Sequence, residues 1–76
     1  MHRELTVAQV RGLDDAGAEY VQVLFLESAR IYLLARARPD FEDVLTRLRE
    51  GERVRIATAP PDGDVIGEVE AVQVDG

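Results

Sequence analysis

Hydrophobic and polar positions alternate as in strands over most of the chain. The segments ELTVAQVRGL, YVQVLFL and ARIYLLARA are rich in Val, Leu and Ile, and the polar loop DDAGAE separates the first two. Alternating apolar, β-branched and aromatic residues are typical of strands. The adjacent residues Glu27 and Ser28 between the second and third segments predict a tight hairpin turn.

One segment, residues 40–50, has the spacing of a helix instead. Its apolar residues recur three and four positions apart and share one face: Phe41, Val44, Leu45 and Leu48. Asp40 is of a type favoured at the N-cap, and Gly51 can adopt the left-handed conformation that ends many helices. A helix of about three turns is marginal alone in water, so we expect its apolar face to pack on the strands.

The segments ERVRIATA and DVIGEVEAVQVD are the last two predicted strands, and PPDG between them predicts a turn. A four-residue turn sets a register in which Arg55 faces Glu68 and Arg53 faces Glu70. Opposite charges then meet on one face and apolar residues meet on the other. A three-residue loop with a bulged Gly63 is the alternative, and it shifts the pairing by one residue.

The predicted element order is three strands, one helix and two strands. A five-stranded barrel of the OB type has its helix between strands three and four, where it closes one end. We therefore predict a mainly β, OB-type barrel formed by one domain over residues 1–76. A ubiquitin-like order leaves the first strand unused, and an SH3-like barrel remains the competing interpretation.

The predicted core combines the inward residues of the strands with the helix stripe. It comprises Leu5, Val7, Val21, Val23, Phe25, Ile31, Leu33, Phe41, Val44, Leu45, Leu48, Val54, Ile56 and Val69.

Chain length and composition favour a small globular protein. Its 76 residues are 46% hydrophobic, which is enough for a core but leaves about 40% of the unfolded surface exposed. There is no Cys, so neither a disulfide nor a thiolate metal site can reinforce the fold. No apolar run reaches the roughly 20 residues of a membrane span, and no apolar leader is visible. We expect a soluble cytoplasmic protein that does not bind membranes.

The charge is acidic, with 15 Asp and Glu against 9 basic residues and a formal net charge of −6. Such a balance disfavours a phosphate backbone as the main ligand. The excess is uneven, because residues 30–55 carry seven Arg and five acidic residues and are the only mildly basic part of the chain.

Candidate catalytic residues are scarce. His2 is the only His, Ser28 is the only Ser, and the chain has no Cys or Lys, so a nucleophile and its base are hard to assemble. Glu68 and Glu70 alternate on one strand face opposite arginines, which indicates a solvated ion-pair ladder more than acid–base catalysis. We predict a non-enzymatic protein with no catalytic residue, cofactor or metal.

The one candidate binding surface lies on the second and third strands. If Val21, Val23 and Phe25 point inward together with Ile31, Leu33 and Ala35, the opposite face is rich in aromatic, apolar and Arg side chains. The predicted surface comprises Tyr20, Leu24, Arg30, Tyr32, Leu34, Arg36 and Arg38. Both strands are apolar on both faces, so which face points inward remains open.

Two functions fit this surface. An apolar patch beside Arg and Tyr is typical of a protein–protein contact, which predicts an interaction module for a protein partner or a homodimer. The alternative is single-stranded nucleic-acid binding, with Tyr stacking on bases and Arg contacting phosphates. The acidic loop residues Asp14, Asp15 and Glu19 would repel a phosphate chain, so we prefer the protein contact. An enzyme is a distant third.

Overall fold

The computed structural model describes residues 3–60 and 63–72. His2, part of the predicted PPDG turn and the end of the last predicted strand lie outside the described residues. Five strands and one helix follow the predicted order: β1 (Arg3–Arg11), β2 (Tyr20–Phe25), β3 (Ile31–Ala35), α1 (Phe41–Arg47), β4 (Arg53–Thr58) and β5 (Ile66–Ala71). The strands form one antiparallel sheet in the order β3-β2-β1-β4-β5. The mainly β fold with one helix is therefore confirmed.

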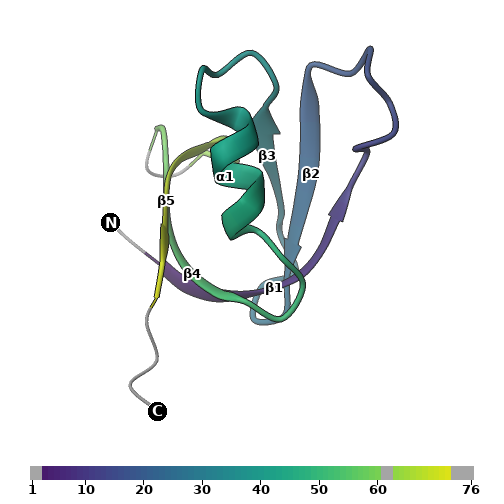
Figure 1. Cartoon of the computed structure of the whole chain (residues 1–76). Helices are drawn as coiled ribbons and strands as arrows, with labels where there is room; N and C mark the ends of the chain where they lie inside the picture. Colours follow the sequence, from purple (N-terminus) through teal and green to yellow (C-terminus); the bar gives the residue numbers. More distant parts are fainter. Residues whose placement is uncertain (1–2, 61–62, 73–76) are drawn as a thin grey trace.

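The long strand β1 joins the two halves of the sheet. Its first part pairs with β4, from Arg3 opposite Ile56 to Thr6 opposite Arg53. Its second part pairs with β2, and the register shifts between Val7 and Gln9. Such a bulge bends a strand and increases its twist, and Figure 1 shows the sheet curling along β1.

The outer strands β3 and β5 approach each other at one point. An isolated parallel bridge links Leu33 with Val65, and the Leu33 N–H donates to the Asp64 carbonyl at 2.8 Å. No continuous ladder joins β3 to β5 in the described residues, so a closed barrel is not confirmed.

Helix α1 lies beside β5 (Figure 1), and its apolar side chains join the core formed with the sheet. Phe41, Val44 and Leu48 are buried in the core, and Leu45 is partly buried against it. The helix ends at Arg47 and is shorter than the predicted 40–50. The predicted apolar stripe is nevertheless the face that packs.

The predicted cap of α1 is only half right. Asp40 occupies the N-cap position, but its side chain makes no capping hydrogen bond. Its carboxylate instead accepts two hydrogen bonds from Arg38, and this stronger, charge-assisted pairing replaces the cap. Gly51 has a φ of 86°, as expected for the left-handed conformation, and lies in the turn after the helix.

The predicted register of the last hairpin is wrong. Arg55 pairs with Glu70 and Ala57 pairs with Glu68, two residues from the prediction. A register shift between Ala57 and Thr58 lengthens the connection, and the Ala59 N–H donates to the Val65 carbonyl. Arg55, Glu68 and Glu70 remain on the exposed face as predicted, because a two-residue displacement preserves the face of a side chain. The register shift, however, places Ile66 in the core, although simple alternation with Glu68 puts it on the exposed face.

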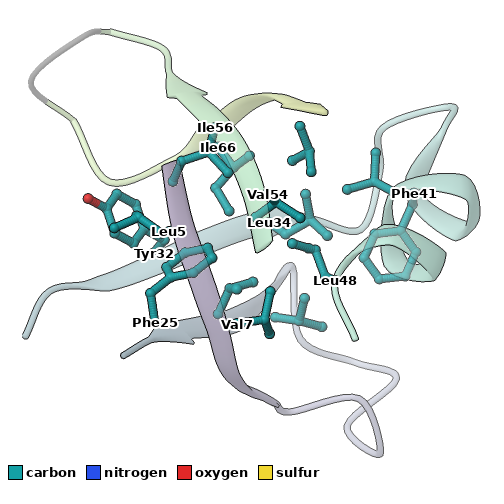
Figure 2. Packing of buried hydrophobic residues seen from close by; sticks show 14 residues of the cluster. Leu5, Val7, Phe25, Tyr32, Leu34, Phe41, Leu48, Val54, Ile56 and Ile66 are labelled. Atoms are coloured by element: carbon teal, nitrogen blue, oxygen red, sulfur yellow. The ribbon is translucent and has the colours of Figure 1, made fainter. Parts of the chain in front are cut away.

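The core is filled by side chains from all five strands and α1 (Figure 2). Most of the predicted core is buried, but Ile31 is 45% exposed, and Leu33 and Leu45 are only partly buried. Among the residues that the structure describes, the prediction missed three buried ones: Tyr32, Leu34 and Ile66. The errors on β3 have one cause, since its inward face is the opposite of the predicted one.

In the described part of the chain, no helix combines the length and apolarity that a membrane crossing needs.

Candidate interaction surface on β2 and β3

The exposed side of the β2–β3 hairpin is set by the pairing of the two strands. Directly opposed residues on antiparallel strands point to the same face, and the opposed outward pairs are Tyr20 with Ala35, Gln22 with Leu33, and Leu24 with Ile31. We call these six residues the outer β2–β3 face. Tyr20 is 41% exposed, Gln22 is exposed, and Leu24 is partly buried. The face is apolar apart from the Gln22 amide and the Tyr20 hydroxyl.

The prediction that Tyr20, Leu24, Tyr32 and Leu34 share one outer face is wrong for β3. Tyr32 and Leu34 are 1% and 0% exposed. Their partners Val23 and Val21 are also buried, so these pairs form the inner face. Ile31, Leu33 and Ala35 take their place outside.

The Tyr32 side chain is buried in the core and makes its contacts there. Its ring meets Phe25 edge-on, with ring centroids 5.4 Å apart and planes at 75°, an arrangement that aromatic pairs favour. Its hydroxyl accepts a hydrogen bond from Arg3 Nη1 at 3.3 Å. Tyr32 therefore has no free ring face for a ligand.

The predicted surface arginines lie at separate places. Arg30 is at the hairpin turn and pairs with Asp64 at 3.1 Å. Arg36 Nη2 donates to the carbonyls of Gly12 at 2.7 Å and Leu13 at 3.2 Å. Arg38 binds Asp40. The structure does not bring these arginines together on the outer β2–β3 face.

Arg36 and Arg38 stabilise loops. The Arg36 guanidinium lies 5.7 Å from the centre of the Phe41 ring, while its hydrogen bonds fix the β1–β2 loop. Arg38 also donates to the carbonyls of Ile66 and Gly67. The hydrogen bond to Asp40 raises the pKa of Arg38 and, in turn, lowers the pKa of Asp40.

A sequence signal for the true face of β3 was available. A two-residue turn at Glu27 and Ser28 places Val23 opposite Tyr32, and the structure has this pair. Opposed residues share a face, so an inward Val23 requires an inward Tyr32. The predicted turn and the predicted face of β3 were incompatible.

A shallow hollow adjoins the Tyr20 end of the outer β2–β3 face. Its walls come from the β1–β2 loop, the start of β2 and the end of β3: Ala16, Ala18, Glu19, Tyr20, Ala35, Arg36 and Ala37. Four of these residues are alanines, whose short side chains leave the hollow unfilled. At the other end of the face, just beyond β2, Leu26 is 71% exposed.

A second concavity lies between α1 and β5 and is polar. Arg47 Nη1 donates to the Val69 carbonyl at 3.1 Å, and Arg38 is bound to the preceding carbonyls of β5. Arg47 also pairs with Asp43 one helical turn away at 3.0 Å. The two guanidinium groups thus donate to three backbone carbonyls of β5, which is an edge strand of the sheet.

Little in the described residues supports chemistry. No group of three or more His, Cys, Asp or Glu within them could hold a metal ion. The Ser28 hydroxyl accepts a hydrogen bond from the Arg30 N–H at 3.2 Å, which fixes the turn.

Comparison with known proteins gives no matching family model, no matching curated protein and no matching solved structure.

Proposed function

We propose that this protein is a small non-enzymatic interaction module, which binds a protein partner through the outer β2–β3 face. The observation that carries the proposal is the exposure of Tyr20 and Ile31 on two paired strands. Leu24 and Leu33 lie beside them on the same face. Apolar side chains that adjoin on a rigid sheet are typical of contact surfaces.

The border of the face also fits a protein contact. On β1, Gln9 pairs with Leu24 and Arg11 pairs with Gln22, and both β1 residues are exposed. Protein interfaces combine an apolar centre that carries few charges with a polar, solvent-accessible rim. The outer β2–β3 face has this composition, with Arg11 and Arg30 at its border.

Oligonucleotide binding is the weaker proposal for the same strands. It needs several aromatic rings for stacking and cations for phosphates. Tyr32 is buried, Arg36 and Arg38 are bound to groups of the fold, and the chain carries a net charge of −6. Tyr20 is the one aromatic side chain of the face that remains open.

We also propose that the sheet is an OB-type barrel of a cytoplasmic protein. The bridge between Leu33 and Val65 supports closure, and α1 follows β3 and precedes β4 as that architecture requires. Hydrogen exchange tests the closure, because the Leu33 amide should then be protected with the central strands. An amide that exchanges as fast as those of exposed loops would contradict it.

Site-specific photo-crosslinking in cells tests the contact surface. A photoreactive phenylalanine analogue replaces Ile31, and in a matched control it replaces the exposed Glu42 of α1. We expect a discrete protein adduct from position 31 and none from position 42. Equal adducts from both positions, or none from position 31, would remove the support for this face.

The mass of the adduct identifies the class of partner. An adduct of two copies of this chain indicates a homodimer, and any other mass indicates a different protein. A nucleic-acid adduct at position 31, abolished by nuclease, would favour the alternative function.

A further inference from the structure

We propose that the hollow beside Tyr20 binds an arginine or lysine side chain of a basic segment in a partner protein. This inference rests on the proposed function, since it assigns the chemistry of the partner at one end of the outer β2–β3 face. Three features of the hollow support it: its alanine walls, the open Tyr20 ring and the carboxylates of the β1–β2 loop.

The shape of the hollow suits a long aliphatic stem. Ala16 and Ala18 of the β1–β2 loop line it together with Ala35 and Ala37 at the end of β3. Arginine and lysine bury their methylene groups along apolar surface while the charged head stays in water. The four methyl groups supply such a surface and place no bulky side chain in the way.

The Tyr20 ring offers a contact for the cation itself. It lies at the start of β2 opposite Ala35 and is 41% exposed. A guanidinium or ammonium group over a tyrosine face is attracted by the ring's negative electrostatic potential. This attraction adds to the burial of the stem.

The β1–β2 loop beside the hollow carries three carboxylates, of which Glu19 lines the hollow together with the cation Arg36; this acidic excess is complementary to a basic segment. Asp14, Asp15 and Glu19 are all exposed and belong to the loop that forms the hollow. None of the three takes part in an ion pair within residues 3–60 and 63–72. Their charges are therefore available to a partner, and they disfavour an acidic peptide or a nucleic acid at the same place.

Arg36 does not compete for these carboxylates, although it lines the hollow. Its Nη2 donates to the Gly12 and Leu13 carbonyls, and its backbone N–H donates to the Glu19 carbonyl at 2.9 Å. Turn hydrogen bonds from Asp15 to Gly12 and from Ala18 to Asp15 also fix the loop. The hollow is thus preformed, which lowers the entropic cost of binding.

The test is a nuclear magnetic resonance titration of the whole protein with the peptide acetyl-GGRLRGG-amide. A second peptide has neutral citrulline in place of each arginine, and a third has glutamate. We expect amide shifts confined to residues 13–20 and 35–37 with the first peptide and none with the others. Shifts spread over all acidic surfaces would overturn the proposal.

Variants separate a local site from a general effect of net charge. Y20A should weaken binding of the arginine peptide about two- to fivefold. Changing Asp14 and Asp15 to Asn and Glu19 to Gln should abolish its salt-sensitive part. The matched control changes the exposed Glu42, Glu50 and Glu68 to Gln, which removes the same charge from other places.

An equal loss of affinity in the control would contradict the site, as would no loss in either triple variant. The peptide titration tests the basic partner, whereas the crosslink from position 31 tests the contact face. A specific adduct at position 31 without peptide binding overturns the basic partner and retains the interaction module. Absence of that adduct overturns the contact face on which the inference rests.

Discussion

Arg38 binds Asp40 through two hydrogen bonds, from Nε to Oδ1 at 2.6 Å and from Nη2 to Oδ2 at 3.1 Å. The same guanidinium donates from Nη1 to the Ile66 carbonyl at 3.1 Å and from Nη2 to the Gly67 carbonyl at 3.0 Å. One side chain therefore connects the start of α1 to the start of β5. A planar guanidinium can satisfy all four acceptors at once, and an ammonium group cannot do so in the same geometry.

Loss of Arg38 should destabilise the fold. We expect Arg38→Ala to lower the free energy of unfolding by about 1–3 kcal/mol, because hydrogen bonds to a charged group are lost and two carbonyls of β5 lose their donor. Urea denaturation measures the change. Arg49→Ala is the matched control, since Arg49 is an exposed arginine just after the same helix. Equal effects of the two substitutions would show that the four-way contact is not stabilising.

Acid should destabilise the protein partly through Glu27. The Thr6 N–H donates to Glu27 Oε1 at 2.7 Å, and the Thr6 hydroxyl donates to Oε2 at 2.7 Å. Both hydrogen bonds lower the pKa of Glu27, and the one from the Thr6 backbone N–H has the larger effect. The nearby Arg53 lowers this pKa further. A carboxyl whose pKa is lower in the folded state stabilises the fold above its unfolded pKa. That stabilisation is lost as the pH falls through the folded pKa.

The measurement is urea denaturation at several pH values from about 7 down to about 3. The lowest pH lies below the ordinary carboxyl pKa of about 4. The wild type should lose more stability on acidification than Glu27→Gln, which cannot be protonated at that position. Thr6→Val removes the hydroxyl donor and should raise the pKa of Glu27 toward its ordinary value in a carboxyl titration. Parallel stability curves for wild type and Glu27→Gln would refute this account.

The orientation of β3 can be tested by two truncations on the same strand. Leu34→Ala should cost about 2–5 kcal/mol of unfolding free energy, because a fully buried leucine leaves a cavity. Ile31→Ala should change it by about 0.5 kcal/mol or less, as expected for a surface position. Thermal or urea unfolding of both variants gives the comparison. A larger loss of unfolding free energy for Ile31→Ala than for Leu34→Ala would contradict this orientation of β3.

The inward face of an element could be predicted from the sequence where polar residues mark one side and apolar residues mark the other. On β2, Gln22 separates Val21 from Val23 and marks the outer face, and the helix stripe ending at Leu48 marks one side of α1. On β3, the run IYLLA has no polar residue, so hydrophobicity alone carries no information about its inward face. Pairing with β2 decides it, and pairing follows from the turn between them.

The candidate surface was only half predictable for the same reason. Tyr20 and Leu24 lie on the outer face as predicted, whereas Ile31 replaces Tyr32 because β3 has the opposite orientation. The hollow beside Tyr20 could not be predicted. It depends on Arg36 folding the β1–β2 loop back onto the end of β3, a contact between residues 24 positions apart in sequence.

The turn after α1 depends on the backbone of Gly51. Its φ of 86° lies in the left-handed region, and its N–H donates to the Val7 carbonyl at 2.8 Å. A Cβ built at this position meets no atom within 4 Å, so the cost of a side chain is conformational and not steric crowding. We expect Gly51→Ala to lower the free energy of unfolding by about 1–2 kcal/mol.

Gly17 provides the matched substitution, because it has no positive φ and a Cβ there would lie 3.7 Å from Asp15 Oδ1, an ordinary contact. Gly17→Ala should be neutral or stabilise the fold by up to about 1 kcal/mol, since alanine restricts the unfolded chain. Urea unfolding of the two variants should therefore give changes of opposite sign or clearly different size. If Gly51→Ala were as stable as Gly17→Ala, the turn would relax to a right-handed conformation without cost. The hydrogen bond from Gly51 to Val7 would then not be what fixes the path from α1 into β4.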